Sequence, residues 1–261
     1  MKNKNLLLKI FVLVAYIAMV GVNYLANALP IGGVTTGEAS DSYANLFTPA
    51  GITFSIWGLI YLLLFGYTIY QFFNKDTKRN KLFASINIYF LITSLANISW
   101  IFAWHYGIIW LSVLIMLVLL IFLIKIADII NKDKYSPLDN LLIRAPFSFY
   151  FGWITVATIA NISVFLVSIN WNGFGISNVI WTIVVLLVGA AIGIARTLKD
   201  QNIFYGLVLV WAYAGIWLKH SSENGFAGEY PNIIAVVIGC IVLYLATLGW
   251  LAYSQIKKNN E

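Results

Sequence analysis

Cysteine, histidine and charged side chains are scarce in this sequence of 261 residues. It contains one cysteine, Cys240, and two histidines, His105 and His220, and only 10% of its residues are Asp, Glu, Lys or Arg. A single cysteine can form neither an internal disulfide nor a thiolate cluster for a metal, so we expect Cys240 to be a small core residue. No Ser-His-Asp set, nucleotide-binding loop or zinc motif is visible, so the sequence predicts no catalytic residues and no metal site.

So little charge cannot cover a water-soluble domain, because such domains carry about 25% charged residues. Hydrophobic residues make up 61% of the chain, and they fall into blocks of about twenty, the length that crosses a hydrocarbon core of about 30 Å. We therefore predict an all-α integral membrane protein, a polytopic helix bundle. The predicted spans are residues 6–28, 53–73, 82–104, 108–130, 146–168, 179–195, 204–218 and 231–253.

The basic residues predict the orientation of these spans. Every lysine and arginine except Lys219 falls at a terminus, in an alternate connection or at the span ends beside it, and such residues accumulate on the cytoplasmic side. We therefore predict a multi-pass protein of a bacterial inner or plasma membrane with both termini cytoplasmic. The net charge of +6 is then explained by the bilayer, and nucleic acid is not an expected partner.

The first block, after Lys2 and Lys4, ends in Ala26, Asn27 and Ala28, a pattern that also fits a signal peptide with its cleavage site. The block of about 23 residues exceeds the usual apolar core of 7 to 15, so we expect a retained helix. The connection 29–52, which contains Pro30, is the longest on the outer side. A loop of this length is either functional or disordered, and its aromatic and apolar residues favour a lid that folds over the helix ends.

Ionisable residues at membrane depth, the usual markers of ion-coupled transport, are almost lacking. His105 could ligate a haem iron, but its place at a helix end favours an interfacial histidine hydrogen-bonded to water or to a headgroup. What the spans do contain is aromatic residues paired with polar amides at helical spacing. Asn97 and Trp100 share one face of the third span.

Two further spans show the same pattern. Trp153, Ala157 and Asn161 are spaced by four along the fifth span, and Trp57 and Tyr61 are four apart on the second. These stripes have two interpretations that spacing alone does not separate. Buried asparagines can hydrogen-bond between helices, or the stripes can line a pocket for a flat apolar ligand.

At these residues the sequence resembles the tryptophan-rich sensory protein family, TspO/MBR, whose animal member is the translocator protein or peripheral-type benzodiazepine receptor. The similar segments are FTPAGITFSIWGLIY, with Pro49, Trp57 and Tyr61; LANISWIFAW, with Asn97 and Trp100; and WITVATIAN, with Trp153, Ala157 and Asn161. They cover residues 1–168. Residues 169–261 would then be an extension of three further membrane helices.

The resemblance implies a five-helix core with a cavity under the loop 29–52 that binds porphyrin, haem or other flat hydrophobic molecules. The ligand-binding residues carried over from the family motifs are Pro49, Trp57, Tyr61, Asn97, Trp100, Trp153, Ala157 and Asn161. No cofactor is obligatory, the partners are the ligand and the bilayer, and a homodimer is compatible with the resemblance. The sterol-linked motif of animal members has no counterpart here.

Three functions are consistent with this sequence. The first is a receptor or carrier of tetrapyrroles, acting in sensing or transport. The second is a transporter or permease subunit for a hydrophobic solute, in which the three additional helices would be the distinguishing feature. The third is an enzyme that degrades a tetrapyrrole, although the sequence favours a protein that is not an enzyme.

Overall fold

The computed structural model describes residues 2–29, 31–74 and 76–260, and within these ranges every regular element is helical. Pro30 of the predicted lid and Lys75 of the second basic cluster lie outside the described residues, as do the side chains of Lys2, Lys4 and Lys258. The long helices are α1 (Lys2–Ala28), α3 (Ile56–Phe73), α4 (Thr77–His105), α5 (Ile109–Ile130), α7 (Ala145–Ser168), α8 (Asn178–Asp200), α9 (Ile203–Ser221) and α10 (Pro231–Asn260).

Short helices lie between them. They are η1 (Ile31–Gly33), α2 (Thr36–Asp41), η2 (Gly51–Ser55), α6 (Pro137–Asp139), the π-helical turn η3 (Asn140–Arg144) and η4 (Gly173–Gly175). Helix α2 begins with a capping box, in which Thr35 and Glu38 exchange hydrogen bonds. The bond that the Thr35 backbone N–H donates holds the pKa of Glu38 below its usual value.

Eight helical segments of the described chain are long and apolar enough to cross a membrane, which confirms the predicted number. The seventh, predicted from hydropathy at fifteen residues, has 19 in the structure because α9 continues to Ser221. Helix α4 begins five residues before its predicted start, at Thr77, after the N-cap Asp76. Polar residues lengthen these helices beyond their apolar blocks, so hydropathy alone underestimates their length.

The helices form two compact units. The first contains Met1–Ser42 and Ile56–Ile154, and the second contains Tyr43–Ser55 and Thr155–Glu261. The boundary falls inside α7, and the outer connection is divided at Ser42. The predicted division into a family-like core, residues 1–168, and an extension, residues 169–261, rests on the resemblance and stays a prediction. The two compact units have different boundaries.

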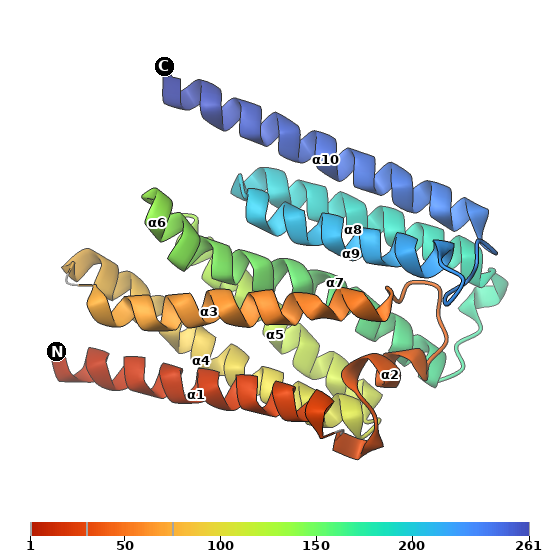
Figure 1. The fold of residues 1–261 in the computed structure, drawn as a ribbon, viewed down its shortest axis with the longest axis horizontal. Coiled ribbons are helices and arrows are strands. Elements are labelled where there is room, and N and C mark those ends of the chain that lie inside the picture. The colour runs from red at the N-terminus through yellow and green to blue at the C-terminus, as the bar shows by residue number, and fades with distance from the viewer. Residues whose placement is uncertain (1, 30, 75, 261) are drawn as a thin grey trace. The chain divides into compact units, whose positions relative to one another are not determined.

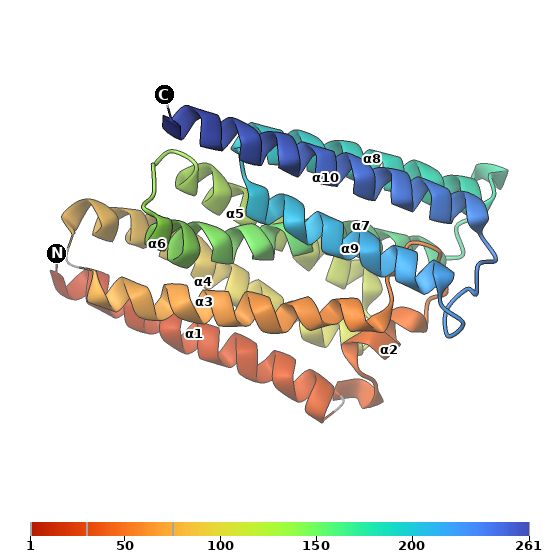
Figure 2. The same ribbon diagram turned by 45° about the horizontal axis from the view of Figure 1, so that its top comes forward.

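In the first unit α4 packs against both α1 and α5, and α1 also packs against α3 (Figures 1 and 2). The centre of this unit is aromatic. Tyr67, Phe90 and Phe147 meet edge to face, with Tyr67 and Phe147 at 4.7 Å between ring centroids. All three side chains are buried, and edge-to-face contacts of this kind add to the stabilisation from burial alone.

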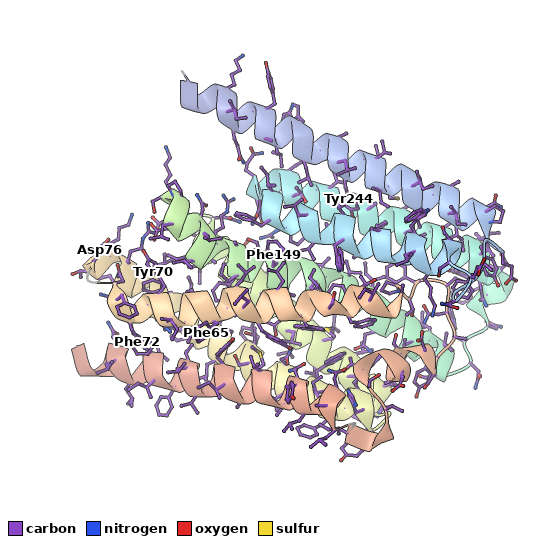
Figure 3. The ribbon with its side chains drawn as sticks, viewed as in Figure 1. Phe65, Tyr70, Phe72, Asp76, Phe149 and Tyr244 are labelled. Atoms are coloured by element: carbon purple, nitrogen blue, oxygen red, sulfur yellow. The ribbon has the colours of Figure 1, made fainter. Side chains whose placement is uncertain are left out.

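Polar and charged groups gather at one end of the first unit, where α3 ends and α4 begins, as Figure 3 shows for Tyr70 and Asp76. Asp139 accepts hydrogen bonds from Arg79 at 2.8 Å and from Tyr70 at 3.0 Å, and Lys78 pairs with Asp133. The basic residues of these elements therefore share one end of the unit, as the predicted topology requires. Which side of the membrane this end faces stays a prediction.

In the second unit α8, α9 and α10 pack side by side (Figure 1). Tyr244 of α10, labelled in Figure 3, lies with its ring 5.2 Å from that of Tyr213 and donates to the carbonyl of Gly189. Cys240 is 1% exposed in the same core, which confirms it as a buried residue. Arg196 and Asp200 pair at the end of α8, so basic and acidic groups also cluster at one end here.

Candidate functional site

The aromatic residues predicted on the second and fifth spans meet in the first unit. The rings of Trp57 and Tyr61 stack at 5.4 Å with 18° between their planes, as one helical turn separates them. Tyr150 and Trp153 of α7 present their edges to Trp57 at 5.8 and 6.3 Å. These four residues form what we call the Trp57 cluster. The structure therefore brings together three of the predicted ligand-binding residues and adds Tyr150.

Asn97 connects three helices beside this cluster. Its amide donates to the Tyr150 hydroxyl at 3.3 Å, and its carbonyl oxygen accepts from Asn23 of α1 at 2.6 Å. Asn97 and Tyr150 are fully buried and Asn23 is 6% exposed. The amide therefore ties α1, α4 and α7 together, as the structural interpretation of the stripes expects.

Tyr61 offers a polar group that the protein itself does not use. Its backbone carbonyl accepts from Tyr16 at 2.8 Å, but its buried hydroxyl has no hydrogen-bond partner among the residues that the structure describes. An unsatisfied buried hydroxyl costs about 1–3 kcal/mol. Trp57 and Tyr61 are also only half-buried, whereas Trp153 is 3% exposed. The cluster thus combines accessible ring surface with an unused donor.

Trp100 lies on the same face of α4 as Asn97 and stacks on Trp104 at 5.5 Å. Trp104 donates its indole N–H to the carbonyl of Thr36 at 3.2 Å. Through Trp104 this predicted ligand residue lies close to the outer connection.

His105 fixes that connection. Its Nδ1 lies 2.9 Å from the carbonyl oxygen of Ile31 and its Nε2 lies 3.1 Å from the hydroxyl of Thr36. The carbonyl can only accept, so Nδ1 donates and Nε2 accepts. A Cβ on Gly32, which has φ +69°, would lie 2.6 Å from the carbonyl oxygen of His105. The expectation of a histidine bonded to water or headgroup is wrong, because both ring nitrogens bond to the protein.

The remaining predicted residues belong to the second unit. Pro49 is buried in the segment 43–55, next to Ala50, whose N–H donates to the carbonyl of Gly215 on α9. Ala157 is half-buried and Asn161 is 2% exposed, and both continue the face of α7 that carries Trp153. The predicted lid is therefore divided: residues 31–42 lie on the end of α4, and residues 43–55 belong with α9.

The chemistry of the Trp57 cluster is stacking and hydrogen bonding. Over the described ranges, no group of three or more His, Cys, Asp or Glu residues is arranged to hold a metal ion. Flat aromatic surface with a few oriented polar groups is the usual lining of a site for an apolar ligand. The sequence did not predict Asn23 and Tyr150 as part of this site, although an amide within an apolar span and a tyrosine three residues before Trp153 are signals for them.

Replacing Asn97 with alanine tests its structural role. Since Asn23 and Tyr150 would each lose a partner, we expect the free energy of unfolding to fall by about 0.6–1.7 kcal/mol, the range measured for interhelical hydrogen bonds in membranes. Unfolding by SDS in mixed micelles measures this change. Ser99→Ala is the control, because the exposed Ser99 donates to the Leu95 carbonyl of its own helix. Equal stability of both variants would contradict the helix-tying role.

A model of the TSPO-like protein family matches residues 9–250. Neither the curated proteins nor the solved structures include a significant match to this chain. The family match continues past residue 168 through α8 and α9 and into α10, beyond the segment on which the resemblance was based. With its eight candidate spans, the chain is a polytopic helical membrane protein that belongs to the TSPO-like protein family.

Proposed function

We propose that this protein is a membrane receptor or carrier that binds a tetrapyrrole, such as a porphyrin or haem, or a similar flat hydrophobic ligand at the Trp57 cluster. The observation that carries the proposal is the buried Tyr61 hydroxyl, which has no partner within the described part of the chain, beside the stacked ring of Trp57. A ligand that stacks on Trp57 and accepts a hydrogen bond from Tyr61 would remove the cost of that unsatisfied group. Family membership is consistent with the proposal.

The residues of the Trp57 cluster and Asn97 would have different roles in binding. Trp57 and Tyr61 would supply the ring face, Trp153 and Tyr150 would hold Trp57 from the side, and Asn97 would fix Tyr150. Pro49, Trp100, Ala157 and Asn161 stay ligand residues by resemblance. A carrier needs no catalytic group, and none is assigned.

Quenching of tryptophan fluorescence by protoporphyrin IX in the detergent-purified protein tests the proposal. We expect saturation near one ligand per chain. Tyr61→Phe should weaken binding by about three- to ten-fold, the equivalent of one hydrogen bond. The same change should leave the fold as stable or make it more stable, because it removes an unsatisfied buried hydroxyl. Trp57→Leu should weaken binding by at least about ten-fold, because it removes the stacking surface.

Two matched variants control this experiment. Tyr24→Phe removes a hydroxyl from a side chain that is 71% exposed on α1, and Trp110→Leu removes an indole that is 58% exposed on α5. Both should bind as the wild type does. Linear, partition-like quenching, or an unchanged affinity in both cluster variants, would contradict the proposal. If binding is saturable, protein-dependent flux of the ligand into liposomes separates a carrier from a receptor.

A further inference from the structure

A cavity of about 440 Å³ lies wholly within the second unit. Its walls come from residues 44–47, the end of α7, the start of α8 and the connection between α9 and α10. None of its lining residues belongs to the Trp57 cluster or to the residues predicted from the sequence. Its volume lies at the smaller end of the range of ligand pockets, roughly 300–1,000 Å³.

One wall is a short segment held in place by its own polar groups. The side-chain oxygen of Asn45 accepts from the N–H groups of Phe47 and Thr48 at 3.1 and 3.0 Å, and its amide donates to the carbonyl of Tyr43. His220 Nε2 donates to the Leu46 carbonyl at 2.9 Å. Because these groups bond to one another, the wall is formed before a ligand arrives.

His220 also supports a second wall. The fully buried imidazole lies 4.8 Å from the ring of Phe226 and 5.8 Å from that of Tyr230, and these two rings meet at 5.4 Å. Backbone N–H groups of Phe226 and Gly228 donate to the carbonyls of Lys219 and His220. The connection between α9 and α10 is therefore folded onto the end of α9, with two rings against the cavity.

A third wall is a pair of tryptophans. Trp171 and Trp181 lie 5.2 Å apart, and the indole N–H of Trp181 donates to the Gly173 carbonyl at 2.8 Å. Gly173 has φ +61°, and a Cβ there would lie 3.0 Å from the Trp181 ring. The glycine thus permits the close approach that fixes this ring.

The lining determines the class of ligand. It contains five large aromatic side chains, from Phe47, Trp171, Trp181, Phe226 and Tyr230, together with aliphatic side chains and a few neutral polar groups, and none of its residues is Asp, Glu, Lys, Arg or His. Burying a charge without a partner is costly, so a ligand that places a charged group inside the cavity does not match it. An uncharged molecule with flat rings matches both the surface and the volume.

We propose that this cavity is a second binding site, specific for a small uncharged aromatic molecule of two or three rings. The site is independent of the tetrapyrrole site proposed above, because the two share no residue. Asn178, Ser163 and Thr182 are the lining groups that would orient a carbonyl or hydroxyl of the ligand.

Benzophenone tests the proposal, because this uncharged two-ring ketone marks its own binding site when it is illuminated. The reconstituted protein would be irradiated with increasing benzophenone, digested and mapped by mass spectrometry. We expect labelling of residues 163–185 and 226–230 to saturate with dose, whereas labelling of lipid-facing positions such as Leu62 and Val242, which are 66% and 58% exposed, should rise linearly. Linear labelling throughout would overturn the proposal.

Two neighbouring valines provide a matched pair of variants. Val185 lines the cavity and Val184, 42% exposed, does not. Because a phenyl ring would fill part of a small cavity, Val185→Phe should lower the saturable labelling by at least about ten-fold, and Val184→Phe should leave it unchanged. Equal labelling in both folded variants would overturn the proposal. Should Val185→Phe fail to fold, Val179→Phe at another lining position replaces it, and the labelling map of the wild type decides by itself.

The same experiment separates this site from the tetrapyrrole site. Trp57→Leu should not change the benzophenone labelling, and excess protoporphyrin IX should not compete with it. Loss of saturable labelling in Trp57→Leu would assign the probe to the other site and overturn this proposal, whatever the outcome of the porphyrin titration.

Discussion

Replacing Arg79 with alanine is expected to lower the free energy of unfolding by about 3–5 kcal/mol, the cost of leaving one member of a buried ion pair alone. Arg79 and Asp139 pair at 2.8 Å with side chains that are 19% and 10% exposed. Asp139 also accepts from the hydroxyls of Tyr70 and Ser136, at 3.0 and 2.9 Å. Removing the guanidinium would leave a nearly buried carboxylate with neutral donors only.

The preceding residue provides the control. Lys78 pairs with Asp133 at the same distance, 2.8 Å, but its side chain is 79% exposed. Exposed pairs contribute about 0–1 kcal/mol, so Lys78→Ala should have little effect although it removes the same charge one position away. SDS unfolding of both variants, with the tryptophan signal as the readout, measures the difference. A loss of equal size in the two variants would show that net charge, rather than the buried pair, stabilises this end of the first unit.

Much of the fold could be predicted from the sequence because a bilayer restricts the length and the composition of a helix that crosses it. Each span needs about twenty apolar residues, and the eight predicted blocks correspond to the eight candidate spans of the structure. The ends of the helices were less predictable. The N-cap Asp76 and the polar residues after it extend α4 outside its apolar block, and hydropathy does not detect a cap.

In the candidate site, only the contacts between residues of the same helix could be predicted. Spacing placed Trp57 next to Tyr61 and Asn97 next to Trp100, because neighbours on one helix follow from its period. Contacts between helices depend on how each helix is rotated about its axis, which the period does not give. For this reason Asn23 and Tyr150, the partners of Asn97, were not predicted.

The outer connection was the least predictable part. The sequence favoured one lid over residues 29–52, but the structure divides it at Ser42 between the two units. Two carbonyls explain the division. The Ile31 carbonyl accepts from His105 of α4, and the Leu46 carbonyl accepts from His220 of α9. Each histidine thus holds the part of the connection that lies near its own helix end, and no local pattern in the loop indicates this.

Gly215→Ala is expected to destabilise the second unit by about 1–3 kcal/mol, the usual cost of forcing extra volume into a packed core. A Cβ at Gly215 of α9 would overlap the hydroxyl of Thr53 and would lie 2.6 Å from its Cγ2. Thr53 cannot easily move away, because its backbone carbonyl accepts from the Trp211 indole at 2.9 Å and the neighbouring Ala50 N–H donates to the Gly215 carbonyl at 3.0 Å.

The matched control is Gly239→Ala on α10, where a Cβ would meet nothing within 4 Å. An exposed helical glycine costs about 1 kcal/mol relative to alanine, so this variant should be as stable as the wild type or more stable. Thermal unfolding of both variants in the same detergent measures the difference: Gly215→Ala should be less stable than the wild type, and Gly239→Ala should be as stable or more stable. Two stabilised variants would show that residues 50–53 do not lie on α9, and the division of the outer connection between the two units would then have to be abandoned.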